Sequence, residues 1–231
     1  MIRVQTVNAT ETKGVKGPST MFISIFLILS SCLLPPSVAL EESFSASDVG
    51  KLPPEFIAMH TGDGPPGKWL VTSDGDNRVL TQRDDSQSKD RTHIAIVDHQ
   101  KLRNVKLSVR IKLVGGEKEK SAGIVWRFKD KKNYLLARID VKDKRVRLYR
   151  VINGNRIRIG GDDKTELQHD RWYTLRIEHI GDNIKVYLDD NIVAMQEDRH
   201  FRDFGGIGLW TKSDSVAFFD DLHLKAFDAT H

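Results

Sequence analysis

The chain has 231 residues, of which 36 are Lys or Arg and 32 are Asp or Glu, so the formal net charge is +4. This length allows one large domain or two small ones. Basic and acidic residues are interleaved along the chain, whereas nucleic-acid-binding proteins usually gather basic residues into one patch. The composition therefore argues against a nucleic-acid partner.

The N-terminal part reads as a targeting segment. Residues 21–34 form the apolar run MFISIFLILSSCLL, and small residues follow up to Ala39. This pattern predicts a signal peptide over residues 1–39, with Met1 or Met21 as the start. Alternatively, Leu29-Ser-Ser-Cys32 fits a lipoprotein signal, in which Cys32 would carry a lipid anchor to the membrane. Both interpretations predict a secreted, periplasmic or cell-envelope protein.

The remainder is predicted to be a single domain over residues 41–231, because no linker or repeat divides it. Cys32 is the only cysteine of the chain and precedes this domain, so the domain is expected to have neither a disulfide nor a thiolate metal site. Residues 41–67 are rich in Gly and Pro, which excludes a helix there. We expect this entry segment to wrap the first edge of a sheet.

Alternating apolar and charged residues predict strands through the rest of the chain. The clearest case is Val105–Leu113, in which every odd-numbered residue is apolar. About a dozen strands are expected, at residues 68–71, 77–82, 92–97, 105–113, 124–128, 134–139, 145–151, 156–159, 172–178, 184–189, 192–196, 207–211 and 215–227. Only residues 196–206 could hold a short helical turn. The regular spacing indicates an all-β sandwich or barrel.

The segment Ser121–Asp140 predicts a β-hairpin, with a charged turn at residues 129–133. Successive strand residues point to opposite faces of a sheet. One face of the second strand is therefore apolar, with Leu135, Ala137 and Ile139. The other face carries Tyr134, Leu136, Arg138 and Asp140, which is a surface suited to presenting polar groups.

Six short motifs give the chain a family resemblance: AGIVWR at 122–127, NYLLAR at 133–138, RWYTLR at 171–176, IKVYLD at 184–189, GIGLW at 206–210 and FDDL at 219–222. The chain from Ser43 to Asp228 resembles the concanavalin A-like lectin/glucanase superfamily. Within it, the chain is most similar to bacterial laminin-G-like domains and exported 3-keto-disaccharide hydrolase domains. The resemblance implies a jelly-roll sandwich of two antiparallel sheets, one of them curved around a concave groove. It also implies that strands 172–178 and 184–189 are adjacent core strands, and that their apolar residues face each other across the sandwich.

The sequence motifs of several well-known catalytic and nucleotide-binding sites are absent. Lectin-like glucanases use a Glu-x-Asp-x-x-Glu strand motif, and the most similar run, Arg138–Asp143, lacks both glutamates. The eight histidines show no HExxH spacing, and no nucleophile elbow or P-loop occurs. Classical glucanase activity and zinc catalysis are therefore not expected.

A sugar-binding groove is the preferred functional prediction, because aromatic rings stack on pyranose faces and charged groups hydrogen-bond to hydroxyls. We predict that Trp126 points inward and Arg127 outward, since burying a lone guanidinium is costly. The predicted substrate-binding residues are Arg127, Tyr134, Arg138, Trp210 and Lys212. The competing interpretation is that Arg and Asp form cross-strand pairs and that the Trp residues are core residues.

Two other functions stay open. The resemblance implies hydrolysis of 3-keto-glycosides, in which the C3 ketone acidifies the neighbouring C–H, so that one base and one electrophilic group suffice. The candidate bases are Asp140 and Asp214, with Arg127 or Arg138 at the oxyanion. The second alternative is a laminin-G-like adhesion module that binds a protein partner.

The resemblance also implies a structural calcium ion. In such domains an aspartate of the last strand binds Ca²⁺ through hard oxygen ligands. Here the candidates are Asp220 and Asp221, joined by Asp48 or Asp63. The alternative is that one of these aspartates caps a turn or pairs with an Arg.

Overall fold

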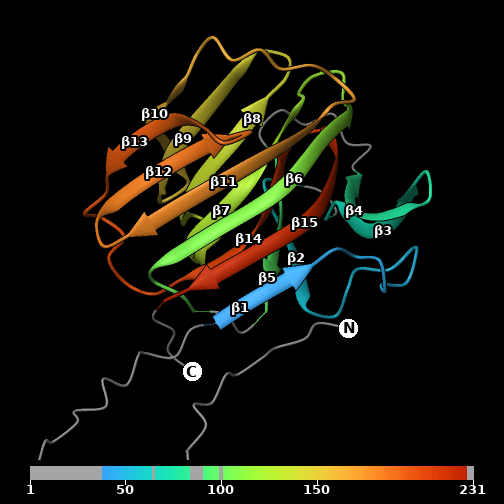
Figure 1. The fold of residues 1–231 in the computed structure, drawn as a ribbon, viewed down its shortest axis with the longest axis horizontal. Helices are drawn as coiled ribbons and strands as arrows, with labels where there is room; N and C mark the ends of the chain where they lie inside the picture. Colours follow the sequence, from blue (N-terminus) through green and yellow to red (C-terminus); the bar gives the residue numbers. More distant parts are fainter. Residues whose placement is uncertain (1–37, 64–65, 84–90, 99–100, 228–231) are drawn as a thin grey trace, which may run out of the picture.

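The computed structural model describes residues 38–63, 66–83, 91–98 and 101–227, and this part of the chain folds into strands and loops without a helix (Figure 1). No helix long and apolar enough to span a membrane occurs among these residues. The strands are β1 (Val38–Glu42), β2 (Phe56–Thr61), β3 (Lys68–Asp74), β4 (Asn77–Arg83), β5 (Thr92–Val97), β6 (Val105–Gly115), β7 (Ser121–Asp130), β8 (Asn133–Asp140), β9 (Arg145–Ile152), β10 (Asn155–Asp162), β11 (Trp172–Ile180), β12 (Asn183–Leu188), β13 (Asn191–Glu197), β14 (Gly206–Lys212) and β15 (Val216–Ala226).

The strands form two antiparallel sheets that pack face to face (Figure 1). Sheet A has the order β13-β12-β11-β6-β15-β4-β3, with β1 also paired to β15. Sheet B has the order β10-β9-β8-β7-β14-β5-β2. The predicted all-β sandwich is thereby confirmed.

Alternation along each strand builds the core between the sheets. In β6 the apolar residues Val105, Leu107 and Val109 are buried, while the intervening residues are partly exposed or exposed. The hairpin strand β8 contributes Leu135, Ala137 and Ile139 to the same core cluster. Trp126 also belongs to this cluster, which confirms that it points inward. Removing this apolar area from water is the main stabilising contribution to the sandwich.

Strands β11 and β12 are neighbours in sheet A, which confirms that they are adjacent, but the expectation that their apolar residues face each other across the sandwich is wrong. Leu175 pairs with Leu188 and Ile177 pairs with Val186 in an antiparallel ladder. The alternation of each strand is as predicted, but the apolar residues of both strands lie side by side on the inner face of the same sheet. Sequence periodicity reports which face is buried, but not which sheet holds the strand.

Two strands at the start of the described chain are not predicted from the sequence: β1 spans the end of the predicted signal peptide, and β2 lies in the Gly- and Pro-rich entry segment. β1 pairs with β15, and β2 forms an edge of sheet B against β5. The prolines fall outside both strands. The predicted signal peptide lies outside the described residues except for Val38 and Ala39, which are the first two residues of β1.

Residues 198–205, in the one segment that could hold a short helical turn, form a loop. The carboxylate of Asp198 organises this loop by accepting hydrogen bonds from the backbone N–H groups of His200 (2.9 Å) and Phe201 (3.0 Å). Arg150 Nε on β9 donates to the other oxygen at 2.6 Å. An aspartate that binds the backbone two and three residues ahead favours a turn over a helix.

Candidate functional site

The outer face of sheet B carries a second apolar cluster, separate from the core. It consists of Ile94, Ile96, Val125, Tyr134, Leu136, Val151 and Trp210. Each of these residues alternates with a core residue of its own strand, as the pleat requires. Phe128 and Tyr134 lie together at one end of this cluster, with ring centroids 5.8 Å apart. The polar groups of this face lie next to these packed apolar side chains.

A pocket of about 450 Å³ opens beside this cluster. Two distant strand ends contribute to it, since β2 and β5 supply one wall while β8, β9 and β10 supply the other. Its described lining residues are His60, Thr61, Gly62, Thr92, Lys131, Lys132, Tyr134, Val151, Gly154 and Arg156. They combine hydroxyl groups, an aromatic ring and cationic side chains, and none of them is a carboxylate.

Tyr134 and two threonines supply the hydroxyl groups of this pocket. The Thr61 and Thr92 hydroxyls are hydrogen-bonded to each other at 2.7 Å across β2 and β5. Burial raises the pKa of Tyr134, although the nearby Arg156, Trp210 and Thr92 oppose that rise. The tyrosine therefore keeps its proton at neutral pH and can donate it to a ligand oxygen.

Arg138 and Asp140 form a buried ion pair on the same face. Arg138 Nη1 lies 3.2 Å from Asp140 Oδ2 and donates a short hydrogen bond to the Ser121 hydroxyl. The Arg138 guanidinium also lies over two rings, 5.6 Å from the centroid of Tyr149 and 5.9 Å from that of Trp210. The guanidinium is thus held by a carboxylate, a hydroxyl and two aromatic rings.

Asp140, one of the two predicted bases, is saturated by partners. Besides Arg138, it accepts from Arg145 Nη2 at 3.3 Å and from the backbone N–H of Asp143 at 3.1 Å. Its side chain is 1% exposed. A carboxylate in this setting serves as the centre of a structural ion network, and it has to lose a partner before it can take a proton from a ligand.

The second predicted base, Asp214, anchors the loop between β6 and β7. Its carboxylate accepts from the backbone N–H groups of Glu117 (2.8 Å), Lys118 (3.0 Å) and Glu119 (3.0 Å). Burial favours a higher pKa, but these backbone hydrogen bonds outweigh it and lower the pKa of Asp214. Lys212 pairs with Glu119 of the same loop. Neither residue lines the pocket.

Arg127 takes a different place from the one predicted. It lies at a β-bulge of β7 with a φ of 50° and is 1% exposed. Its Nη1 donates a hydrogen bond of 2.6 Å to the backbone carbonyl of Asp203, a residue of the loop before β14. Burial lowers the pKa of His179 on sheet A, and the Arg127 guanidinium lowers it further. Arg127 thus holds the bulge and an adjoining loop together, away from the pocket.

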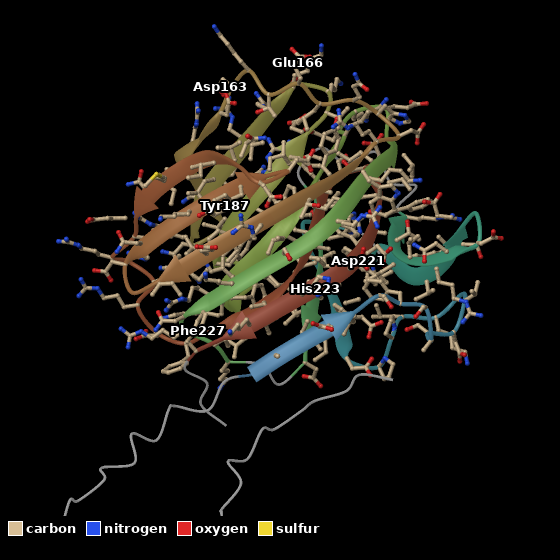
Figure 2. All side chains as sticks on the ribbon, viewed as in Figure 1. Asp163, Glu166, Tyr187, Asp221, His223 and Phe227 are labelled. Atoms are coloured by element: carbon tan, nitrogen blue, oxygen red, sulfur yellow. The ribbon has the colours of Figure 1, made fainter. Side chains whose placement is uncertain are left out.

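The two aspartates predicted to bind calcium are engaged with other partners. Asp220 accepts from Asn77 Nδ2 at 2.7 Å, and burial raises its pKa. Asp221 pairs with Arg110 at 3.0 Å and lies on the outer face of sheet A (Figure 2). Among the described residues, no three His, Cys, Asp or Glu side chains gather as a metal site requires. These residues do not fit a bound calcium ion, because Asn77 and Arg110 already engage the two carboxylates and no third described acidic or histidine side chain joins them.

The structure therefore brings together only part of the predicted set. Tyr134, Trp210 and Arg138 share one face. The other three, Arg127, Lys212 and Asp214, bind neighbouring loops instead. Sequence reasoning missed the threonines of β2 and β5 and the cations of two turns. Tyr134 lies opposite Val151 in the ladder of β8 and β9, and only the register and the sheet order show which strand ends meet at the pocket.

Comparisons with known proteins place this architecture in context. The carbohydrate-binding module CBM66 from Bacillus subtilis is 26% identical, covers 69% of this chain and 92% of its own, and superposes with a TM-score of 0.60. The exoplasmic/lumenal domain of VIP36, in a Ca²⁺/Man-bound form, covers 84% of this chain and 91% of its own with a TM-score of 0.58. At 12% identity, that second likeness concerns the fold alone.

A sequence relative and a family profile complete the comparison. Levanase from Bacillus subtilis (strain 168) is 28% identical over 165 residues, which are 68% of this chain, and the chain spans only 21% of that levanase. The profile of the 3-keto-alpha-glucoside-1,2-lyase-like domain matches residues 58–225. The chain therefore belongs to the family of 3-keto-alpha-glucoside-1,2-lyase-like domains.

Proposed function

We propose that the protein binds carbohydrate in the pocket on the outer face of sheet B. The observation that carries this proposal is a pocket of about 450 Å³ lined by Thr61, Thr92 and Tyr134, in a chain 26% identical to a carbohydrate-binding module. Hydroxyl groups in a partly apolar pocket match the alternating C–H and O–H surface of a sugar. The lack of a carboxylate among the described lining residues favours binding over hydrolysis.

Tyr134 contributes mainly through its hydroxyl and the edge of its ring, because it is only 2% exposed. The proposed sugar therefore lies against a rim of hydroxyl and cationic groups instead of a broad aromatic platform. Levan is the first ligand to test, since a relative at 28% identity is named a levanase. We retain the prediction that the protein is exported, which fits a polysaccharide ligand.

The test is isothermal titration calorimetry with levan and a panel of neutral oligosaccharides. We expect binding by the parent protein, weakened several-fold in the Thr61→Val/Tyr134→Phe variant, which loses two hydroxyls but keeps most of its volume. Tyr187→Phe is the matched control, because Tyr187 lies on the outer face of sheet A (Figure 2). The proposal is wrong if the folded parent binds no saccharide, or if both variants bind as the parent does.

A second candidate is elimination of 3-keto-glycosides, which the matching family profile and the Arg138–Asp140–Arg145 group favour. In that reaction a base takes the C2 proton, the C1=C2 double bond forms and the glycosidic oxygen leaves with its electron pair. Asp140 would be the base and Arg138 would stabilise the enolate oxygen. Turnover of a 3-keto-glucoside by the parent that is lost in Asp140→Asn under conditions where the variant is folded would support this activity. Absence of turnover by the parent would contradict it.

An adhesion role for a protein partner stays a prediction. The exposed large apolar side chains of the described residues are Val49, Ile57, Ile157, Ile180, Ile192 and Met195. They are spread over β2, β10, β11, β13 and a loop, so they favour no single partner surface.

A further inference from the structure

Three cationic side chains meet at one wall of the sheet B pocket. Lys131 and Lys132 come from the turn between β7 and β8, and Arg156 comes from the start of β10. The backbone N–H of Gly154 donates to the carbonyl of Lys132 at 2.9 Å, which ties the β7–β8 turn to the β9–β10 turn. The backbone therefore holds the two turns that carry these cations next to each other.

None of these three side chains forms an ion pair or side-chain hydrogen bond with a described residue. Other cations of the same sheet do: Lys129 pairs with Asp203 at 2.7 Å, and Arg158 pairs with Asp163 at 2.9 Å. Three like charges around a shared concavity repel one another, and an anionic group placed among them relieves that repulsion.

The one carboxylate in this turn is already used within the turn. Asp130 Oδ1 accepts from the backbone N–H of Lys132 at 2.7 Å, and Asn133 Nδ2 donates to it at 3.0 Å. It does not line the pocket, so the described lining carries three positive side chains and no negative one. The opposite wall offers the neutral hydroxyls of Thr61 and Thr92.

We propose that the pocket selects a saccharide that carries a carboxylate or sulfate group. The anionic group lies among Lys131, Lys132 and Arg156, while the sugar hydroxyls face the threonine wall. Arg156 binds two oxygens of such a group at once, and each lysine adds a charge-assisted hydrogen bond. This inference rests on the proposed carbohydrate binding and adds the charge of the ligand to it.

The experiment compares ligand pairs that differ in charge but share a backbone. Polygalacturonate is set against its methyl-esterified form, and dextran sulfate against dextran, each titrated into the full chain by calorimetry. We expect the charged member of at least one pair to bind about tenfold or more tightly than its neutral partner. Which pair responds distinguishes a carboxylate from a sulfate. The preference should shrink as the salt concentration rises.

Variants assign the effect to the pocket. Lys131→Gln/Lys132→Gln/Arg156→Gln should abolish the preference for the charged member, whereas Lys185→Gln, on β12 of the other sheet, should not. Polyglutamate serves as a polyanion without sugar rings, and equal binding of it would overturn the proposal. If neutral sugars bind as tightly as charged ones, the charge inference fails while carbohydrate binding stands. If no saccharide binds the folded protein, both fail.

Discussion

Trp126 donates its indole N–H to Nδ1 of His179 over 3.0 Å, and this hydrogen bond joins the two sheets through the core. The rings meet edge to face, with an interplanar angle of 87°. Burial and the Arg127 guanidinium together lower the pKa of His179 from 6.5 to about 4. The acceptor role of Nδ1 requires an unprotonated nitrogen, so this contact exists only while His179 is neutral.

This arrangement predicts a loss of stability in mild acid. Because the folded-state pKa lies below the unfolded-state value, the unfolded chain binds the proton first as the pH falls from 6.5 to 4. Stability is full above pH 6.5 and falls by about 3 kcal/mol across that window. Denaturant unfolding at intervals of half a pH unit measures it.

A matched pair of variants isolates the histidine. His179→Gln can still accept the indole N–H through its amide oxygen, so its stability should vary much less between pH 6.5 and 4. His200→Gln, at an exposed loop position, should keep the pH dependence of the parent. Buried Glu42 and Asp220 have raised pKa values, which stabilise the fold as the pH falls and partly offset the loss. An unchanged slope in His179→Gln would contradict the prediction.

Asp214 should prove a structural residue. Asp214→Asn leaves one acceptor oxygen for three backbone N–H groups, which should cost about 1–3 kcal/mol at pH 7. Since the folded-state pKa is lowered, the contribution of Asp214 is present above its unfolded pKa and is lost as the pH falls through the folded value. Asp190→Asn, with a side chain 92% exposed, is the control and should change little. Loss of activity without loss of stability would restore a catalytic role.

Breaking the buried pair on sheet B should be more costly. Asp140→Asn leaves the Arg138 guanidinium without its carboxylate, and removing one partner of a buried pair costs about 3–5 kcal/mol. The double variant Arg138→Met/Asp140→Leu should cost less than the sum of its single changes. Arg202→Gln, which loses a surface pair with Asp182, should stay within about 1 kcal/mol of the parent. Thermal and urea unfolding provide the comparison.

Calcium should leave the last strand unaffected. Because Asp220 is bound by Asn77 and Asp221 by Arg110, we expect Asp221→Asn and the parent to respond alike to added Ca²⁺ or EDTA. The measurement is the melting temperature with each additive. A calcium-dependent rise in the parent that disappears in Asp221→Asn would restore the calcium expectation.

Most of the fold follows from alternation, because burial of one face leaves a period of two in the sequence. The strand 92–97 is reproduced residue for residue, and β6 differs only at its end. The two missed strands are short: β1 overlaps the predicted signal peptide, and β2 lies between Pro and Gly residues. Each is stabilised by pairing with a distant strand, which the local sequence does not show.

The site was less predictable, because it depends on which strand ends meet. Tyr134 and Arg138 were assigned correctly to one face of β8, since parity alone decides that. Parity failed at Arg127, where a bulge with positive φ redirects the chain. The cations of the pocket wall could not be predicted, because the proposal about them depends on their having no ionic partner among the described residues, and partners are a property of the folded molecule.

The last strand has a consequence for how the molecule assembles. At its Asp220–His223 bulge, β15 stops pairing with β4 and begins pairing with β1, while β6 follows its other edge throughout. The first described strand thus finds its partner only when the last one is present. Three strands of sheet A, β1, β4 and β6, pair with residues 216–226. Closing this sheet therefore depends on contacts between distant parts of the sequence, and such contacts slow folding. A chain cut before β15 would leave three strand edges open and prone to pair with other copies.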